Sequence, residues 1–341
     1  GAQVLSIMAG YDPGRFIGVA PNAEYILAKT EENATELPVE EDRWVAGLEW
    51  AVELGAQVVN SSLGYNIWDV GESYEYADLD GQTALTSIAA AMAVERGVVV
   101  VVAAGNEAGS AWHYITAPAD AEGVITVGSV GISVDSERLP VIAGSSSRGP
   151  TADGRIKPDV VAPGQGVVVA NVRGGDYKRS SGTSFASPIV SGVCALLLQA
   201  NPQWKPDDVL STLRSSALDL GEAGPDTVYG WGHIQAFSAS GLRISTPKHT
   251  AFMNPFPNPA YGQNMYFPLL LDGREEVRLS IFDVSGSTVF DRVWNMMSGS
   301  YVRSDNALYW PIDPNVASGV YFYRLRSASV NTSGSLAVIR R

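Results

Sequence analysis

The chain has 341 residues, 45% of them hydrophobic, with 23 basic and 36 acidic side chains and a net charge of −13. The length predicts two domains, and the composition is that of a packed globular protein rather than a low-complexity chain. Residues 246–341 hold 9 Lys and Arg against 7 Asp and Glu, which leaves 14 against 29, a net of −15, in residues 1–245. A domain this acidic repels phosphate backbones, which argues against nucleic acid as a partner.

The apolar runs are those of a soluble fold. We find no run of about 18 uncharged apolar residues and expect no transmembrane segment. The only cysteine, Cys194, rules out an internal disulfide, and its apolar neighbours at 193–198 predict a small core residue. Residues 1–10 already resemble a structural element followed by a turn, so we expect the N-terminus to be a truncation.

The first 240 residues alternate short apolar strands with amphipathic helices. Residues 23–29 predict a strand, and the spacing of Trp44, Leu48 and Val52 predicts a helix. Five consecutive valines at 98–102 fit a central strand of a parallel sheet that is covered on both faces. This order predicts a three-layer α/β domain with a mostly parallel sheet over residues 1–240. Two further strands are expected at 58–60 and 124–130, and a further helix from Leu85, Ile88 and Met92, ended by Gly97.

The pattern changes after Ala239. Residues 241–252 lack helical or strand periodicity, and we assign them to a linker. In residues 253–341 no helical pattern is visible, and Val277, Leu279 and Ile281 alternate with polar residues. This part predicts a small antiparallel β-sandwich domain.

Ser184 is the first candidate for chemistry. It lies in residues 181–188 (SGTSFASP), just before the helix-like run 189–200. A serine at a helix N-terminus gains the positive end of the helix dipole and a free backbone N–H for an oxyanion. The alternative is a helix N-cap without chemistry. The G-x-S-x-G elbow is excluded because Ala186 stands where the second glycine belongs.

Asn106 is the second candidate. It follows the valine strand directly, within residues 101–107 (VVAAGNE). Ligands bind at the carboxyl ends of strands in open α/β sheets, and a short amide held there can direct its N–H groups at a developing oxyanion. The alternative is an asparagine in an ordinary turn beside Gly105.

These motifs and their order resemble the subtilase family of serine proteases. Residues 103–106 (AAGN) resemble its oxyanion motif and residues 182–188 (GTSFASP) its nucleophile motif. The resemblance implies a serine endopeptidase with a Ser-His-Asp mechanism and polypeptide substrates. It implies Ser184 as nucleophile, with Asn106 and the Ser184 N–H as oxyanion donors, and two sides of a substrate cleft: Ser62, Leu63 and Gly64 on one, and Ala103, Ala104 and Gly105 on the other. The other family landmarks are residues 18–23 (GVAPNA), 60–64 (NSSLG), 147–150 (SRGP), 157–164 (KPDVVAPG) and 229–233 (YGWGH).

The chain departs from the family pattern at its start. Residues 1–10 (GAQVLSIMAG) match the stretch that follows the catalytic histidine, which places that histidine one position before Gly1 and the aspartate further upstream. His113, His233 and His249 are expected to be loop, turn and linker residues, because none of them opens a helix beside a glycine. The fragment alone is therefore expected to be inactive, since a serine hydroxyl without a base is a weak nucleophile.

The last 90 residues have a resemblance of their own. Residues 254–259 (NPFPNP), 279–286 (LSIFDVSG), 317–325 (ASGVYFYRL) and the basic end 339–341 (IRR) resemble a type IX secretion C-terminal sorting domain. The resemblance implies the outer-membrane secretion machinery as a partner, and a secreted or cell-surface protein of a Gram-negative, Bacteroidetes-like bacterium. The alternative is a carbohydrate-binding or stabilising β-sandwich.

The sequence leaves two questions open: whether the protein is catalytically active, and whether it binds a metal. The competing function is a catalytically dead subtilase-fold protein that binds peptides or serves at the cell surface. We expect no cofactor and assign no metal ligand, although subtilases often bind structural calcium and Asp78, Asp80 and Asp176 lie in loops.

Overall fold

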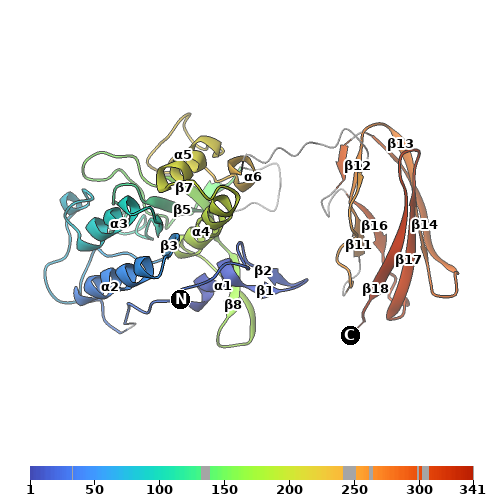
Figure 1. The fold of residues 1–341 in the computed structure, drawn as a ribbon, viewed down its shortest axis with the longest axis horizontal. Helices are drawn as coiled ribbons and strands as arrows, with labels where there is room; N and C mark the ends of the chain where they lie inside the picture. The colour runs from blue at the N-terminus through green and yellow to red at the C-terminus, as the bar shows by residue number, and fades with distance from the viewer. Residues whose placement is uncertain are drawn as a thin grey trace. The chain divides into compact units, whose positions relative to one another are not determined.

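The computed structural model describes residues 1–32, 34–131, 139–240, 251–260, 264–297, 299–301 and 307–340. The chain divides into two compact units, Gly1–Leu242 and Arg243–Arg341 (Figure 1). Residues 241–250 of the expected linker, His249 among them, lie outside the described residues.

Unit 1 is an α/β unit. Its helices are α1 (Ala2–Ala9), α2 (Val39–Glu53), η1 (Tyr76–Asp78), α3 (Leu85–Glu95), α4 (Thr183–Ala200), α5 (Pro206–Ser216) and α6 (Ala236–Ala239). Its strands are β1 (Tyr11–Asp12), β2 (Phe16–Ile17), β3 (Val58–Ser61), β4 (Val99–Ala103), β5 (Ile125–Gly131), β6 (Val141–Ile142), β7 (Val160–Gln165), β8 (Val167–Asn171) and β9 (Asp176–Ser180).

The main sheet of unit 1 is mostly parallel. Strand β3 pairs with β4, β4 with β5, and β5 with β7, all in parallel, while the short β6 pairs antiparallel with β5. Two small antiparallel pairs, β1 with β2 and β8 with β9, lie outside this sheet.

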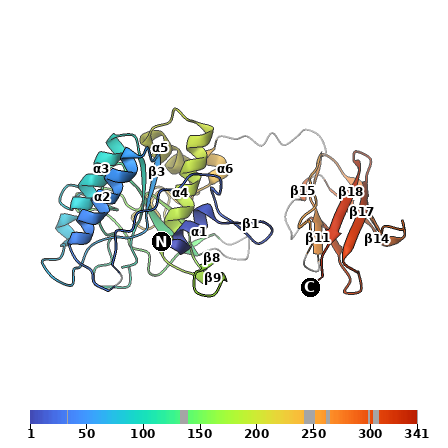
Figure 2. The same ribbon diagram turned by 60° about the horizontal axis from the view of Figure 1, so that its bottom comes forward.

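Strand β4 shows why the unit has three layers. Its residues are all buried, and their side chains alternate between two separate cores. Val100 and Val102 pack in one core with Trp44 of α2, while Val99 and Val101 pack in another with Val190 of α4. Figures 1 and 2 show α2 and α3 together on one side of the sheet and α4 and α5 on the other. A parallel sheet that is buried on both faces needs a strand that is apolar throughout, which the valine run supplies.

Several expected elements are confirmed, and one is wrong. Strands β3, β4 and β5 and helices α2 and α3 form where the patterns predict them, and Cys194 is a buried core residue of α4. The strand expected at residues 23–29 does not form among the described residues. A strand needs a partner for its backbone groups, and no described segment pairs with this one; Ile26 and Leu27 are instead 38% and 63% exposed.

The expectation of no transmembrane segment is consistent with the described structure, whereas one boundary of the linker needs correction. Helix α4 is, by length and composition, apolar enough to cross a bilayer, although most of it is buried in the core of unit 1. Composition alone therefore does not separate a buried core helix from a membrane span. Phe252, which we assigned to the linker, lies in strand β10 and packs against the core of unit 2.

Unit 2 consists of antiparallel strands. They form the order β14-β13-β17-β18 in one sheet, β10-β12-β15 in a second, and a β11-β16 pair. Val277, Leu279 and Ile281 of β13 are fully buried in a core that Trp310 and Leu325 share, as their alternation predicts. The strands are β10 (Ala251–Phe252), β11 (Asn264–Phe267), β12 (Leu269–Leu271), β13 (Glu275–Phe282), β14 (Thr288–Met296), β15 (Gly299–Tyr301), β16 (Leu308–Pro311), β17 (Gly319–Arg326) and β18 (Asn331–Val338).

Candidate active site

Two candidate segments lie at the same edge of the main sheet. Residues 62–64 follow β3 directly, and Ala104, Gly105 and Asn106 follow β4. Because β3 and β4 are parallel, their carboxyl ends meet at one edge, where ligands bind in open α/β sheets. The N-terminus of α4 reaches the same edge, since the Thr183 hydroxyl donates to the carbonyl oxygen of Gly105 over 3.1 Å.

Ser184 is the second residue of helix α4 and is half-buried. The helix begins after Gly182, whose φ of 142° is a conformation that side chains disfavour. The Phe185 N–H donates to the carbonyl oxygen of Gly182 over 3.0 Å. Within the described part of the chain the backbone N–H of Ser184 has no acceptor, so it is free to donate to an incoming oxygen.

The side chain of Asn106 is held by the start of α4. Its Oδ1 accepts from the Thr183 N–H over 2.9 Å and from the Thr183 hydroxyl over 3.3 Å. Since these bonds occupy the oxygen, the amide nitrogen is left to donate at the exposed end of the side chain. A Cβ on Gly182 would come within 3.3 Å of that Oδ1, so glycine leaves room for Asn106 beside the nucleophile.

Ser184 and Ser62 are joined by two hydrogen bonds, one donated by the hydroxyl of each residue. The Ser184 hydroxyl donates to the carbonyl oxygen of Ser62 over 3.0 Å, and the Ser62 hydroxyl donates to the carbonyl oxygen of Ser184 over 3.0 Å. The structure therefore brings the candidate nucleophile against the first residue of the candidate substrate segment. Sequence reasoning placed both residues at the site but gave no indication of this reciprocal contact.

The two candidate substrate segments differ in what their backbones can do. Leu63 and Gly64 make no backbone hydrogen bond to any described residue, so their N–H and C=O groups are free to pair with an extended peptide. The Ala104 N–H and C=O are bonded to Val127 and Thr116. The Gly105 carbonyl accepts from the Ser147 N–H, so this side of the site offers a wall rather than a pairing edge.

Both glycines at these walls are required by close contacts. A Cβ on Gly64 would lie 2.1 Å from Thr116 Oγ1, and one on Gly105, whose φ is 106°, would lie 2.8 Å from Ser147 Oγ. The Thr116 segment also bonds to both walls, because the Tyr65 N–H donates to Ala117 and the Thr116 N–H to Ala104. One segment thus fixes the separation of the two walls.

Comparison with known proteins settles the family. A family model described as the subtilase family, of S8 peptidases, matches residues 1–232. The chain belongs to the subtilase family. It is 30% identical over 247 residues to the serine protease AprX of Bacillus subtilis (strain 168), covering 65% of this chain and 52% of that protein. It is 33% identical over 226 residues to subtilisin E of the same organism, covering 66% of this chain and 51% of that protein.

A solved structure is similar in fold as well. The crystal structure of fervidolysin from Fervidobacterium pennivorans aligns with a TM-score of 0.56 at 24% identity, covering 99% of this chain and 52% of that one. The chain spans about half the length of the curated relatives AprX and subtilisin E. The subtilase-like α/β fold and the mostly parallel sheet predicted from the sequence are confirmed.

The described histidines of this subtilase lie apart from the candidate nucleophile. His113 is exposed, has a φ of 45°, and packs against Tyr114 with its ring plane tilted by 37°. His233 forms isolated bridges with Val161 and Leu218, and burial lowers the pKa of its imidazole. Neither contacts Ser184 in the described structure, and His249 lies outside the described residues.

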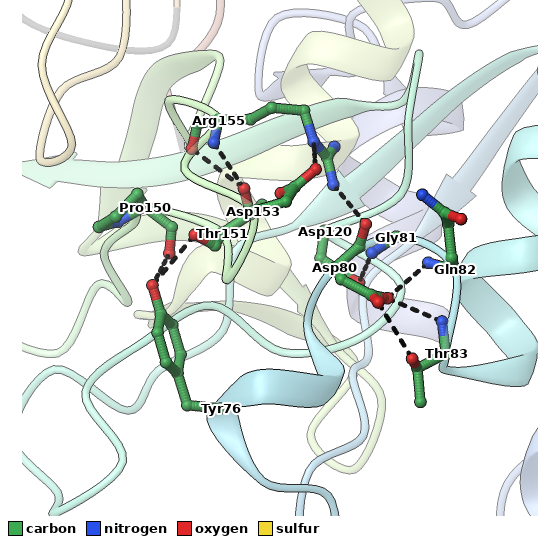
Figure 3. Close-up of polar contacts among 10 residues, drawn as sticks. All are labelled: Tyr76, Asp80, Gly81, Gln82, Thr83, Asp120, Pro150, Thr151, Asp153 and Arg155. Atoms are coloured by element: carbon green, nitrogen blue, oxygen red, sulfur yellow. Dashed lines mark hydrogen bonds and ion pairs between the residues drawn. The ribbon is translucent and has the colours of Figure 1, made fainter.

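The candidate calcium ligands are engaged in other bonds. The Asp80 carboxylate accepts from the Gln82 and Thr83 N–H groups over 2.8 Å each, which closes the loop before α3 (Figure 3). Asp78 Oδ2 accepts from the Glu75 N–H, and Asp176 pairs with Arg15 over 2.7 Å. The expectation that all three lie in loops is wrong for two of them, because Asp78 ends η1 and Asp176 begins β9, where each has a bonding partner.

One acidic cluster has ligand atoms close together. Carboxylate oxygens of Glu31, Glu36 and Glu40 lie within 4.8 Å of one another. Both oxygens of Glu40 accept backbone N–H groups, from Glu32 and Leu37, and Glu31 accepts from the Tyr65 hydroxyl. Burial, and then the charge of Glu40, raises the pKa of Glu36. The donor set is largely satisfied by the protein itself, so it fits a cation poorly.

Proposed function

We propose that the protein to which this chain belongs is a serine endopeptidase. The observation that carries the proposal is the start of α4, where Ser184 stands beside a free backbone N–H and an asparagine whose Oδ1 is already bonded. An amide fixed in this way presents an N–H donor without reorganisation, which is what an oxyanion site requires.

The proposed chemistry follows from these groups. Ser184 Oγ attacks the carbonyl carbon of a peptide bond, and the carbonyl oxygen becomes an oxyanion that the Ser184 N–H and the Asn106 amide stabilise. The proton of Ser184 passes to a histidine and from it to the leaving amine. We place that histidine one position before Gly1, and its aspartate partner further upstream. Helix α1 begins directly after Gly1 and packs against α4, which carries the nucleophile.

An exposed apolar segment supports a contribution from further residues. Residues 24–30 run without ladder bonds to any described strand, and within them Ile26 is 38% and Leu27 63% exposed. Apolar side chains on an unpaired extended segment are a ready pairing edge for another strand. We infer that a strand from upstream of Gly1 covers this edge and carries the aspartate.

Substrate binding is assigned to the two walls. An extended peptide pairs with the free backbone of Leu63 and Gly64. The Ser62 carbonyl, which accepts from the Ser184 hydroxyl in the free protein, accepts a substrate N–H once the peptide is bound. Ala103, Ala104 and Gly105 form the opposite wall without pairing. Their small side chains favour apolar substrate side chains over a broad range.

The experiment compares three proteins: the full-length protein, its Ser184→Ala variant, and the 341-residue chain alone. We expect the full-length protein to cleave an unfolded protein substrate and a chromogenic peptide, and Ser184→Ala to reduce the rate to the residual level of about 10³–10⁴ over water, a figure known for a subtilisin. The isolated chain should show no more. Robust cleavage by the isolated chain that Ser184→Ala abolishes would contradict the upstream base. Peptide binding without cleavage by the full-length protein would favour the catalytically dead alternative.

We further propose that residues 253–341 direct export of the protease through the outer-membrane secretion machinery of a Gram-negative, Bacteroidetes-like cell. The motifs at residues 254–259 and 317–325 support this reading, and unit 2 has its own hydrophobic core. The proposed catalytic groups all precede this unit. The sandwich is thus expected to be dispensable for chemistry and needed for location.

A further inference from the structure

Behind the candidate nucleophile lies a chain of polar side chains that starts at Asn60. Asn60 is on strand β3, two residues before Ser62, and its amide faces the first turns of α4. Its Oδ1 accepts from the hydroxyls of Ser187 and Ser191, each over 2.9 Å, and its Nδ2 donates to Ser62 Oγ over 2.9 Å. Ser187 and Ser191 are both buried and one helical turn apart, so they present one polar face of α4 to β3.

The chain of bonds ends at the carbonyl oxygen of Ser184. In a regular helix that oxygen would accept from the N–H four residues later, but residue 188 is a proline and has no N–H to give. The Ser62 hydroxyl donates to it instead, over 3.0 Å. Because Ser62 Oγ uses its hydrogen for Ser184, it must accept from Asn60, which fixes the direction of the two bonds that lead from Asn60 through Ser62 to Ser184.

On these grounds we propose that Asn60 is a positioning residue, which acts through Ser62 to hold Ser184 in register with the substrate strand. The proposal rests on the proposed peptidase function. Asn60 joins three elements at once: β3, the substrate segment and α4. The half-buried amide has its acceptor and one donor satisfied. Its removal would leave the buried Ser187 hydroxyl without its acceptor, whereas the Ser191 and Ser62 hydroxyls would keep the carbonyl oxygens of Ser187 and Ser184. Asn60 itself does not contact the reacting atoms.

Displacement of the nucleophile lowers the catalytic rate steeply, since a shift of about 1 Å can reduce that rate on the order of 10²-fold. In the full-length protein we therefore expect Asn60→Ala to lower kcat by about 10- to 100-fold with KM changed by less than about threefold. Ser62→Ala, which keeps the backbone carbonyl for the substrate, should have an effect of similar size. The Asn60→Ala/Ser62→Ala double variant should be no slower than the slower single variant, because both changes break one relay.

The matched control is Asn201→Ala, at the C-terminal end of α4 and about 27 Å along the helix from Thr183. Its Nδ2 also donates to a neighbour, the carbonyl oxygen of Leu197, over 3.1 Å. This variant should keep the wild-type kcat. An unchanged kcat in Asn60→Ala, or effects of Asn60→Ala and Ser62→Ala that multiply in the double variant, would overturn the positioning role.

A second measurement does not depend on peptidase activity. Hydrogen exchange of the 341-residue chain reports on the amides of residues 183 and 185–187, and we expect Asn60→Ala to speed their exchange by about tenfold or more while Asn201→Ala leaves it unchanged. Faster exchange in Asn60→Ala together with an inactive full-length wild type would refute the proposed function but keep the positioning role. An active wild type with unchanged kcat and exchange in Asn60→Ala would refute the positioning role alone.

Discussion

The replacement of Asn106 by aspartate separates two tasks of this side chain: it accepts hydrogen bonds from Thr183, and it is proposed to donate one to the oxyanion. A carboxylate at position 106 can still accept from the Thr183 N–H and hydroxyl, which the amide oxygen does now over 2.9 and 3.3 Å. It cannot donate to an oxyanion, and its charge opposes one. We therefore expect Asn106→Asp in the full-length protein to keep the fold and lower kcat by at least about 10²–10³, a range measured for such a donor in a subtilisin and carried over to Asn106.

Asn106→Ala removes both tasks. Its kcat should fall by a comparable factor, and unfolding should cost about 1 kcal/mol less than in Asn106→Asp because the Thr183 N–H loses its acceptor. The assay is kcat and KM on a chromogenic peptide, with thermal unfolding of each variant. Asn201→Asp places the same charge at the far end of α4 and should keep the wild-type kcat. A rise in KM at constant kcat, or a wild-type kcat in Asn106→Asp, would refute the oxyanion assignment.

Three further predictions concern stability and location. Asp159→Asn should lower the free energy of unfolding by about 3–5 kcal/mol and the melting temperature by about 6–20 °C, because Lys157, 3% exposed and 2.7 Å from Asp159, and Arg214 would lose their charged partner. Burial raises the pKa of Asp120, so the folded state disfavours the ionised carboxyl and the wild type loses stability as the pH rises above the ordinary aspartate pKa of about 4. Asp120→Asn should therefore gain stability relative to the wild type as the pH rises, and a constant difference in denaturant titrations would refute this. Deletion of residues 253–341 from the full-length protein in its native host should retain the protease within the cell envelope with its specific activity intact, whereas normal secretion would contradict the sorting role.

The α/β core could be predicted from the sequence because one feature decided it. The run of valines at 98–102 has no polar face, so it needs a helix layer on each side, and the structure provides both. Helix α3 was found through Leu85, Ile88 and Met92, yet these residues are 39–45% exposed, whereas Ala90 and Ala93 are buried in the core. The helical spacing of the apolar residues was correct. The side chains that face the core are small, however, and a search for large apolar residues does not find them.

The sequence did not show which strands and which polar side chains pair with one another. Residues 23–29 have the composition of a strand, but a strand forms only where another backbone completes its hydrogen bonds. The same holds for the polar contacts of the site. Ser184 and Asn106 were found from their motifs, whereas Asn60 was not, because Ser187 and Ser191, which donate to it, are far away in the chain. The signal that could have found it is the i, i+4 pair Ser187 and Ser191 within an otherwise apolar helix, which requires a polar partner.

The central claim, that Ser184 is the nucleophile, is tested most directly by covalent labelling. The full-length protein would be incubated with a fluorophosphonate, which transfers its phosphonyl group to an activated serine oxygen with release of fluoride, and digested for mass spectrometry. We predict one phosphonylated peptide, the one that contains Ser184, and a loss of peptidase activity in proportion to its yield. Cleavage that persists after complete labelling of Ser184, or full peptidase activity with no adduct at Ser184, would contradict the account.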